Sequence, residues 1–403
     1  EFRRVLFRSR TGAIAKGGAT SRKGDTMKKI LLGTTAIVAV GMIAAPASAA
    51  EKIKLGIGGY MEQYIGFVDA EDDASRTDWA VFDQQSDSEF HLTGSTTLDN
   101  GIKFGVKFEI EGDVAGGTQD ESVMTISSAT LGEVKLGGED DVGVLTAIGM
   151  VEYGIGQGDI DNWLNEGITN IYIDPHIGLW SDENKVSYLS PRFFGLQVAG
   201  SYIPEAGASA GGGVLPNRTT DNGSAYVLAA NYKETFGSVA VGVSYAYNHY
   251  SSFTAAPNNS MNGHAVGAEV GVAGFKVGGA FVRVDDQYSP IAIGTTTSND
   301  GYMWQIGVGY TTGPLKVSAG YVTSELEGRR NLAGEDEADQ FIVSGNYLLG
   351  PGVEARGSVF WADYDDETAN NDQLEEGGGW GIVLGIDLRS EERRVGKECR
   401  SRW

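Results

Sequence analysis

The chain has 403 residues, with 54 acidic and 31 basic side chains, 59 glycines, nine prolines and one cysteine. Its net charge of −23 argues against nucleic acid or an anionic membrane surface as a partner. Glycine at this level without a G-X-Y period is typical neither of collagen nor of a helical domain, and one cysteine excludes a small disulfide-stapled domain.

The N-terminal 49 residues are predicted to lie outside the folded unit. Residues 1–26 are arginine-rich without an apolar period, which is typical of a non-native leader. Residues 27–49 follow the pattern of a secretory signal peptide, with Lys28 and Lys29 before an apolar run and "ASA" before the cleavage point. A transmembrane helix is the alternative interpretation of this run, which is short and ends in small residues.

The C-terminal residues 390–403, "SEERRVGKECRSRW", break abruptly from the alternating pattern that precedes them. They are predicted to be a non-native tail, which leaves residues 50–389 as the folded unit. That unit carries 17 basic and 49 acidic residues, and no segment in it approaches 18 consecutive apolar residues. The sequence therefore predicts an exported, strongly acidic domain that contains no transmembrane helix.

Sixteen strands are predicted along the folded unit, most of them about ten residues long, which is the length that a tilted membrane strand needs. In chain order they cover residues 52–67, 88–98, 101–111, 121–131, 132–138, 184–190, 192–203, 223–233, 235–248, 262–272, 274–285, 300–312, 314–324, 338–349, 351–363 and 377–389.

The connectors between these strands alternate in length. Those after odd-numbered strands are long, for example 68–87, 139–183 and 204–222. Those after even-numbered strands are tight, and "LDNG" at 98–101 and "LGPG" at 349–352 carry the Asn-Gly and Gly-Pro pairs of hairpin turns. Long loops on one side and short turns on the other indicate an all-β fold, a transmembrane antiparallel β-barrel with 16 strands.

The faces of the strands differ in chemistry, as the strand at 300–312 shows. Its apolar face consists of Tyr302, Trp304, Ile306, Val308 and Tyr310, and the residues between them are small or polar. Bilayer hydrocarbon offers no hydrogen bonds, so a sheet can span it only if it closes, and sixteen strands enclose a water-filled channel. The apolar face is therefore predicted to meet lipid. The small residues of the other face, such as Gly307 and Gly309, are predicted to leave the channel open.

The third long connector, 139–183, is far longer than a hairpin needs, and a loop of this length in a compact domain is usually functional or disordered. It contains ten Asp and Glu residues and neither Lys nor Arg. The interleaved large apolar residues, such as Trp163 and Trp180, favour an ordered, packed loop.

The chain resembles the general bacterial porins, and more closely the acidic, glycine-rich porins of alphaproteobacteria. The resemblance rests on the signal peptide, the strand alternation, "GEVKLGGEDD" at 132–141 and the long third loop taken together. The resemblance implies a homotrimer and a third extracellular loop folded into the lumen, where loop carboxylates face a basic cluster on the opposite wall. It also implies a C-terminal aromatic residue, read by the assembly machinery, and none follows Arg389 directly.

Carried onto this sequence, the resemblance assigns two sides of a pore constriction. The acidic side is predicted to consist of Glu139, Asp140, Asp141, Glu152, Asp159 and Asp161. The basic wall is taken from inward-phase residues and consists of Lys54, Lys103, Lys107, Lys135 and Arg356. Opposed charges across a narrow gap would orient water and solutes, although each carboxylate could equally be a solvated loop charge.

The predicted function is a water-filled channel in the bacterial outer membrane for passive diffusion of ions and small hydrophilic solutes, with lipid and lipopolysaccharide around it. Because acidic residues outnumber basic ones, we expect a preference for cations. The alternatives are a substrate-specific porin and a structural or adhesive barrel. Most aromatic residues fall on the outward face instead of forming an aromatic slide in the channel, which favours a general channel.

An enzyme is not expected, because a nucleophile or base would be needed and the chain has only four histidines, of which His91 falls on the lumen face beside Glu89 and Thr93. No cofactor is predicted. Abundant oxygen ligands leave weak Ca²⁺ binding open, and the acidic stretches 335–339 and 363–367 could bridge divalent cations to lipopolysaccharide phosphates.

Overall fold

The computed structural model describes residues 52–70, 80–113, 119–155, 160, 163–164, 183–206, 215–216, 218, 223–253, 260–285, 300–327, 335–365 and 376–394. The predicted leader and signal peptide lie outside these residues, as do residues 395–403 of the predicted tail. Within the described part of the chain, no helix combines the length and the apolar character needed to cross a bilayer.

Sixteen strands and one short helix make up the described structure. The strands are β1 (Lys54–Ala70), β2 (Phe82–Thr97), β3 (Lys103–Glu111), β4 (Gln119–Ser128), β5 (Gly132–Gly138), β6 (Asn184–Leu189), β7 (Leu196–Ala206), β8 (Gly223–Phe236), β9 (Val239–Ser252), β10 (Ser260–Val272), β11 (Phe275–Asp285), β12 (Gly301–Thr312), β13 (Leu315–Glu327), β14 (Glu335–Gly350), β15 (Val353–Asp365) and β16 (Glu376–Arg394). The helix is α2 (Val142–Leu145).

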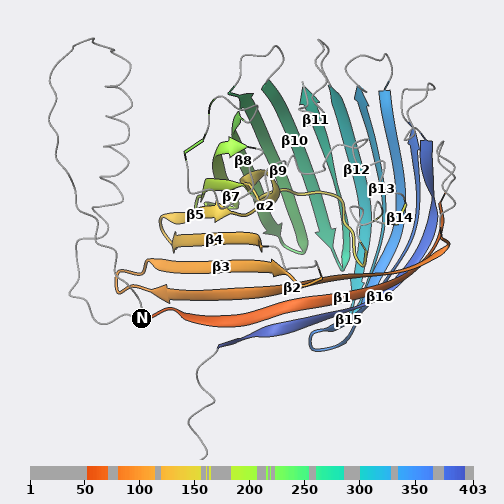
Figure 1. The fold of residues 1–403 in the computed structure, drawn as a ribbon, viewed down its shortest axis with the longest axis horizontal. Coiled ribbons are helices and arrows are strands. Elements are labelled where there is room, and N and C mark those ends of the chain that lie inside the picture. Colours follow the sequence, from red (N-terminus) through yellow and green to blue (C-terminus); the bar gives the residue numbers. More distant parts are fainter. Residues whose placement is uncertain are drawn as a thin grey trace, which may run out of the picture. The chain divides into compact units, whose positions relative to one another are not determined.

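The strands close into one antiparallel barrel in which each strand pairs with its neighbour in sequence, and β16 returns to pair with β1 (Figure 1). At this seam Tyr64 lies opposite Gly385. Closure leaves no strand edge unpaired, which is the condition for a β-structure to exist in hydrocarbon. The predicted sixteen-stranded antiparallel barrel is confirmed.

Several strands extend beyond their predicted ends. β2 begins at Phe82, six residues before the predicted start, and β14 begins at Glu335. β16 continues to Arg394, with Arg393 opposite Ile57, so the predicted strand end at 389 is wrong. Backbone pairing does not require an apolar face, so strands continue past the point where the apolar alternation stops, at both ends of the barrel.

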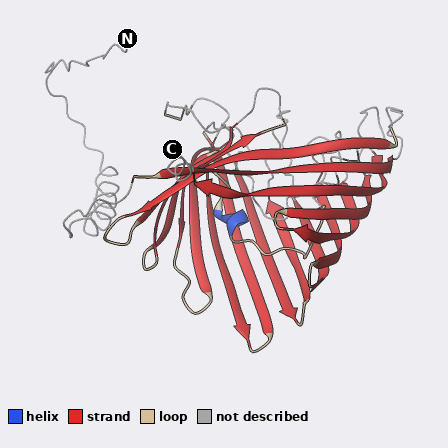
Figure 2. Ribbon diagram, turned by 90° about the horizontal axis from the view of Figure 1, so that it is seen from below, coloured by secondary structure: helices blue, strands red, loops and turns tan. Residues whose placement is uncertain are grey.

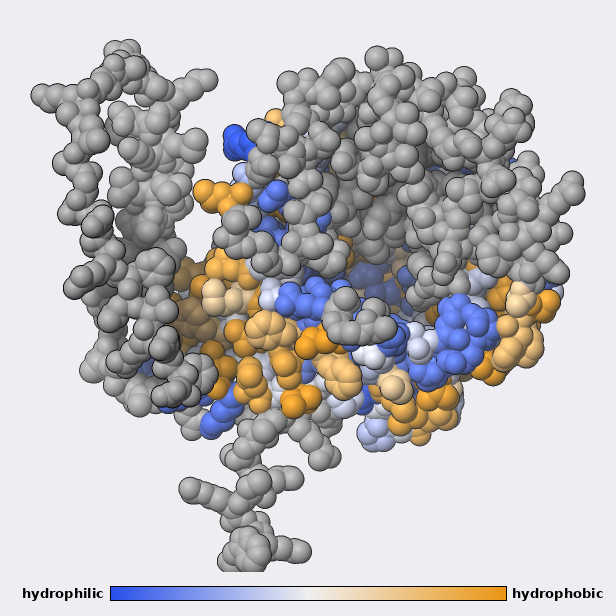
Figure 3. Space-filling model, viewed as in Figure 1, coloured by the Kyte–Doolittle hydropathy of each residue, from blue (hydrophilic) through white to orange (hydrophobic). Residues whose placement is uncertain are grey.

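The barrel has the inverse polarity of a soluble protein. On β12, Ile306 is 51% exposed and Trp304 39%, while Gln305 between them is 5% exposed and Met303 is buried. The same alternation places large apolar side chains on the outer surface of the other strands, and they gather on the barrel face in Figure 3. An apolar outer surface is what a barrel in a bilayer needs, since a soluble protein would bury these side chains. Their contact with lipid stays a prediction.

Aromatic pairs lie near both ends of the outward face. Phe275 and Tyr310 have ring centroids 4.4 Å apart at the tight-turn end, and Phe281 and Tyr302 stack at 6.2 Å toward the long-loop end. This arrangement matches the aromatic girdles of membrane barrels. The tight turn between β10 and β11 has positive φ at both central residues, Ala273 and Gly274, which is the geometry of a type I′ hairpin.

Candidate functional site

A segment of the third loop lies against the inner face of the barrel. We call residues 142–155 the wall segment; it begins with α2, which lies inside the ring of strands (Figure 2). In chain order it hydrogen-bonds to Ser201 of β7, Asn231 of β8, Ser244 of β9, Ser318 of β13, Ser344 of β14 and Ser358 of β15. Between these contacts it passes over Gly267, Gly278 and Gly307 of β10, β11 and β12.

We call the inward residues beneath this segment the small-residue wall: Ser244, Gly267, Gly278, Gly307, Gly309, Ser318, Ser344 and Ser358. The serine hydroxyls satisfy the backbone groups of the segment. Tyr153 N–H donates to Ser318 Oγ at 2.9 Å, and Ile155 N–H donates to Ser358 Oγ at 3.1 Å. An irregular chain with buried backbone needs such partners, because unpaired amide groups are costly to bury.

The glycines allow the segment to approach at backbone distance. A Cβ at Gly267 would lie 1.7 Å from Ile148 O, and one at Gly307 would lie 2.6 Å from Val151 O. The prediction that Gly307 and Gly309 leave the channel open is therefore wrong, since the wall segment covers both. Their small size serves close packing of the loop.

The length of the segment requires an extended path. From Ile148, which bonds to Ser244 of β9, to Ile155, which bonds to Ser358 of β15, it crosses six strand spacings, about 29 Å measured along the sheet. Seven residues reach at most about 25 Å. The segment fits because it runs along the shorter inner arc, nearly extended. Further along the loop, the ring of Trp163 lies against Gly66 of β1, where a Cβ would be 2.1 Å from it.

Asp141 directly precedes the wall segment as the N-cap of α2 and accepts a hydrogen bond from Gly143 N–H at 2.6 Å. Its side chain is fully buried, so it caps the helix and does not border the channel, contrary to its predicted place on the acidic side. Burial raises the pKa of Asp141 to about 7, opposed by the Gly143 hydrogen bond and by the charge of Lys185.

The other predicted loop carboxylates lie in different surroundings. Glu139 is buried and paired with lysines of the barrel wall, Asp140 is half-buried, and Glu152 is exposed between Val151 and Tyr153. Asp159 and Asp161 lie outside the described residues. Narrowing of the channel by the whole 139–183 loop stays a prediction, and Glu152 is the described loop carboxylate best placed for it.

The opposite side of the interior carries ion pairs. We call it the charged wall: Glu62, Glu89, His91, Lys107, Glu109, Glu121, Lys135, Glu139, Arg356 and Asp387, on β1–β5, β15 and β16 and the loop residue after β5. Arg356 donates to Glu62 at 2.8 Å and to Asp387, with 14% of its side chain exposed. Arg389 contacts the same two carboxylates at 3.4 and 2.8 Å.

Two of the predicted basic residues meet around Glu139. Lys135 lies 2.6 Å from Glu139, and Lys107 lies 3.9 Å from it. Lys107 is also 2.6 Å from Glu121 and 2.9 Å from Glu109. The charges therefore meet within the wall itself, where the prediction had opposed them across a gap.

Lys54 and Lys103 line a recess of about 610 Å³ toward the tight-turn end of β1–β5. Lys52, Lys107, Glu133 and a set of threonine and serine hydroxyls also line this recess. The structure thus brings Lys54, Lys103 and Lys107 together and places Arg356 elsewhere, beside Glu62 and Asp387.

The sequence-based selection missed the carboxylate partners of the bases. Glu62, Glu109, Glu121 and Asp387 all lie on the inward phase of their strands, so the alternation contained the signal. The serines and glycines of the small-residue wall were also missed, because small inward residues resemble an open channel in a sequence.

Comparison with solved structures supports the fold. The trimer form of OmpT, an outer membrane protein of Vibrio cholerae, superposes with a TM-score of 0.59 and 12% identity, over 84% of this chain and 100% of its own. The anion-selective porin from Comamonas acidovorans gives 0.54 and 16%, over 84% and 99%. A mutant of the Rh. blastica porin gives 0.53 and 14%, over 83% and 100%. No curated protein matches the chain.

The family model for Gram-negative porins matches residues 33–367, most of the chain. This match agrees with the closed barrel, its apolar outer surface and its charged interior. The chain therefore belongs to the Gram-negative porin family and is a β-barrel protein of the bacterial outer membrane.

Proposed function

We propose that this porin forms a water-filled channel for passive diffusion of ions and small hydrophilic solutes and that it prefers cations. The observation that supports a preference for cations is the pairing of basic side chains with carboxylates on the charged wall. Lys107, Lys135 and Arg356 each have two or more carboxylates within 4.0 Å. Their positive charge is therefore compensated locally.

Further carboxylates add to this excess toward the long-loop ends of β2–β4. Oxygens of Glu89, Glu111 and Asp120 lie within 4.8 Å of one another, as do those of Asp87, Glu111 and Asp113. A channel wall on which carboxylates outnumber basic groups, with low-dielectric surroundings, concentrates cations and repels anions. The lysine recess at the other end opposes this effect and limits its size.

The test is the reversal potential of the purified protein in a planar bilayer under a KCl gradient. We expect the sign that indicates K⁺ permeation over Cl⁻, and the opposite sign would contradict the proposal. The Comamonas acidovorans porin is described as anion-selective. The fold alone therefore does not imply a preference for cations, and the proposal rests on the local charges.

A double variant, Glu111→Gln with Asp120→Asn, should lower the K⁺ to Cl⁻ permeability ratio about twofold. The matched control is Glu325→Gln with Glu337→Gln, a cross-strand pair on the outward phase of β13 and β14. The control removes the same charge from outside the channel and should leave the ratio unchanged. Equal shifts in both variants would show that net charge, and not the wall, sets the selectivity.

We also infer a homotrimer, supported by the trimer form of the Vibrio cholerae neighbour. The outward phase of β1–β4 carries a polar patch: Gln63, Gln84, Ser86 and Ser122. Gln84 donates to Gln63 Oε1 at 2.8 Å, and amide groups at this position are better satisfied against another protomer than in lipid. Ser86→Trp should dissociate the trimer in gentle detergent, while Ile306→Trp on the lipid-facing side of β12 should not.

Lipid and lipopolysaccharide are proposed partners of the outer surface. The exposed apolar band supports contact with lipid. At the long-loop ends of β13 and β14, Glu325 lies opposite Glu337 and Glu327 opposite Glu335 on the outward phase. Carboxylates at this level support bridging of divalent cations to lipopolysaccharide phosphates, which chelator-dependent loss of copurifying lipopolysaccharide would test.

A further inference from the structure

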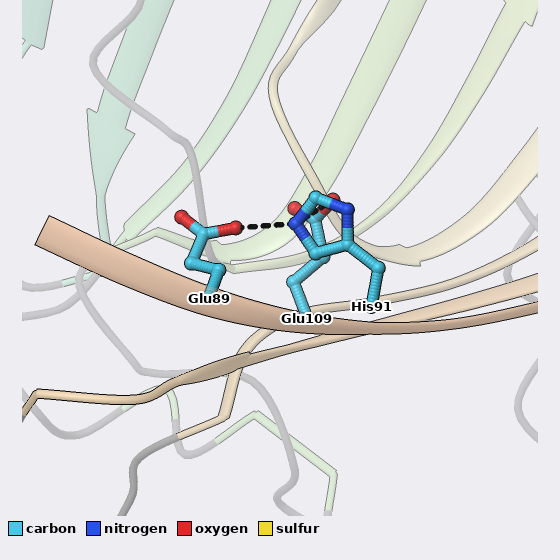
Figure 4. A group of neighbouring side chains, drawn as sticks. All are labelled: Glu89, His91 and Glu109. Carbon is cyan, nitrogen blue, oxygen red and sulfur yellow. Dashed lines mark hydrogen bonds and ion pairs between the residues drawn. The ribbon is translucent and has the colours of Figure 1, made fainter. Parts of the chain in front are cut away.

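A nitrogen and two carboxylate oxygens converge on the charged wall at Glu89, His91 and Glu109 (Figure 4). His91 and Glu109 are direct cross-strand partners on β2 and β3, and Glu89 lies two residues before His91 on the same inward face. His91 Nε2 is 2.7 Å from Glu89 Oε2 and 3.4 Å from Glu109 Oε1. With 27% of its side chain exposed, His91 remains accessible from the channel.

A residue of a third strand holds this group in place. Tyr60 of β1 donates a hydrogen bond from its hydroxyl to Glu89 Oε1 at 2.8 Å, which leaves Oε2 directed at His91. The same ring makes an edge contact with His91, with centroids 5.9 Å apart and planes at 77°. Tyr60 therefore orients two members of the group, as an outer-shell residue does in a metal site.

We propose that Glu89, His91 and Glu109 bind a divalent transition-metal ion on the channel wall, with Tyr60 as the positioning residue. Zinc bonds of about 2.1 Å at tetrahedral angles place two ligand atoms about 3.4 Å apart. The distance from His91 Nε2 to Glu109 Oε1 already has this value, 3.4 Å. The distance from His91 Nε2 to Glu89 Oε2 is 2.7 Å, and a small rotation of the Glu89 side chain lengthens it to the same value. One imidazole with two carboxylates suits Zn²⁺ or Cu²⁺ better than Ca²⁺ or Mg²⁺, which prefer oxygen ligands alone.

Lys107 is the group that competes with the metal, because its Nζ lies 2.9 Å from Glu109 Oε1. It also lies 2.6 Å from Glu121 Oε2, so it keeps a carboxylate partner when Glu109 turns to the metal. The surrounding charge favours the cation, since the oxygens of Glu111 and Asp120 lie within 4.8 Å of Glu89. Three protein ligands leave further coordination positions for channel water.

An ion at this site would add positive charge to the wall. Given the proposed channel function, Zn²⁺ should then lower the K⁺ to Cl⁻ permeability ratio, and His91→Gln should abolish that effect. This consequence rests on the channel proposal, but metal binding does not, since binding can be measured on the solubilised barrel.

The test is titration of Zn²⁺ into the detergent-solubilised, folded protein by isothermal calorimetry. We expect one ion per protomer in the wild type and at least about tenfold weaker binding in His91→Gln and Glu109→Gln. Tyr60→Phe should weaken binding about tenfold while retaining one site per protomer. The matched control is His264→Gln, because His264 lies on the outward phase of β10, where it contacts Tyr245.

A second measurement needs no variant. Zn²⁺ should protect His91, and not His264, from modification by diethylpyrocarbonate, as read by peptide mass spectrometry. Unchanged Zn²⁺ affinity in folded His91→Gln would place the ion on carboxylates elsewhere and overturn the proposal. Loss of binding in His264→Gln, or no protection of His91 in the wild type, would overturn it as well.

Discussion

The two walls of the channel interior have the same strand geometry but opposite kinds of inward side chain, small on one wall and long and charged on the other. The small-residue wall has glycines where large side chains would otherwise stand, so the wall segment packs directly against its backbone. Serine hydroxyls of the same wall accept hydrogen bonds from the backbone of the segment. The charged wall keeps long side chains and ties them to one another, as Arg356 is tied to Glu62 and Asp387. The size and charge of an inward residue in this barrel therefore depend on the chain segment or side chain that packs against it, and not only on contact with water.

The largest effect is expected from filling the small-residue wall. Gly267→Val places its Cβ 1.7 Å from Ile148 O, so the wall segment must leave the sheet and move toward the channel axis. Single-channel conductance should fall more than twofold, and limited proteolysis should cut within 139–183.

The matched control is Gly271→Val on the same strand and the same inward phase. Its Cβ would have Phe275 O at 3.6 Å and Ala240 Cβ at 3.9 Å, so conductance should remain at the wild-type value. Wild-type conductance and protease resistance in Gly267→Val would contradict the close packing of the wall segment.

Removing an arginine from the charged wall should have a smaller effect than filling the small-residue wall. Arg356→Met leaves Glu62 and Asp387 without their main partner, and removal of one member of a buried ion pair costs about 3–5 kcal/mol. Arg389 still reaches both carboxylates, which favours the lower end of that range. The temperature at which the barrel becomes heat-denatured on a gel should fall. Arg283→Met, which breaks an ion pair whose arginine is 61% exposed, should change it little.

Asp141, the N-cap of α2, should make the stability of the protein depend on pH. Burial raises the pKa of Asp141 from the ordinary aspartate value of 3.8 to about 7, so the folded state binds a proton that the unfolded state releases. Stability should therefore fall as pH rises from about 4 to about 7 and change little above that. Asp141→Asn keeps a capping side chain and should flatten the slope, measured as unfolding temperature against pH. An identical slope in both proteins would assign it to other groups.

The smallest change is expected from one anchor of the wall segment. Ser318→Ala leaves the Tyr153 N–H without its acceptor, at a cost of about 1–2 kcal/mol that is confined to the segment. Hydrogen exchange at Tyr153 should accelerate without a change in barrel unfolding. Thr311→Val removes the exposed contact at 3.3 Å to the hydroxyl of the same tyrosine and should leave that exchange unchanged.

Sequence reasoning recovered the barrel because its evidence is local. Alternation and turn chemistry repeat from hairpin to hairpin, and the apolar outward face of β12 is complete within a single strand. The interior depends on register and closure. Glu62 and Arg356 meet only because β16 lies between β15 and β1, and no pattern near either residue predicts that contact. The path of the wall segment was hidden for a related reason, since its partners are glycines and serines with no chemical signal of their own.

The seam between β1 and β16 also determines when the barrel can form. Gly56 pairs with Arg394 and Tyr64 with Gly385, so the first and last strands of the sheet must find each other across almost the whole chain. Contacts of such high sequence separation form slowly, because the entropy of closing the intervening chain is lost before they are made. Until that step, β1 presents an open edge that any other strand could extend. The time between emergence of β1 and arrival of β16 is therefore the interval in which this protein is most exposed to aggregation.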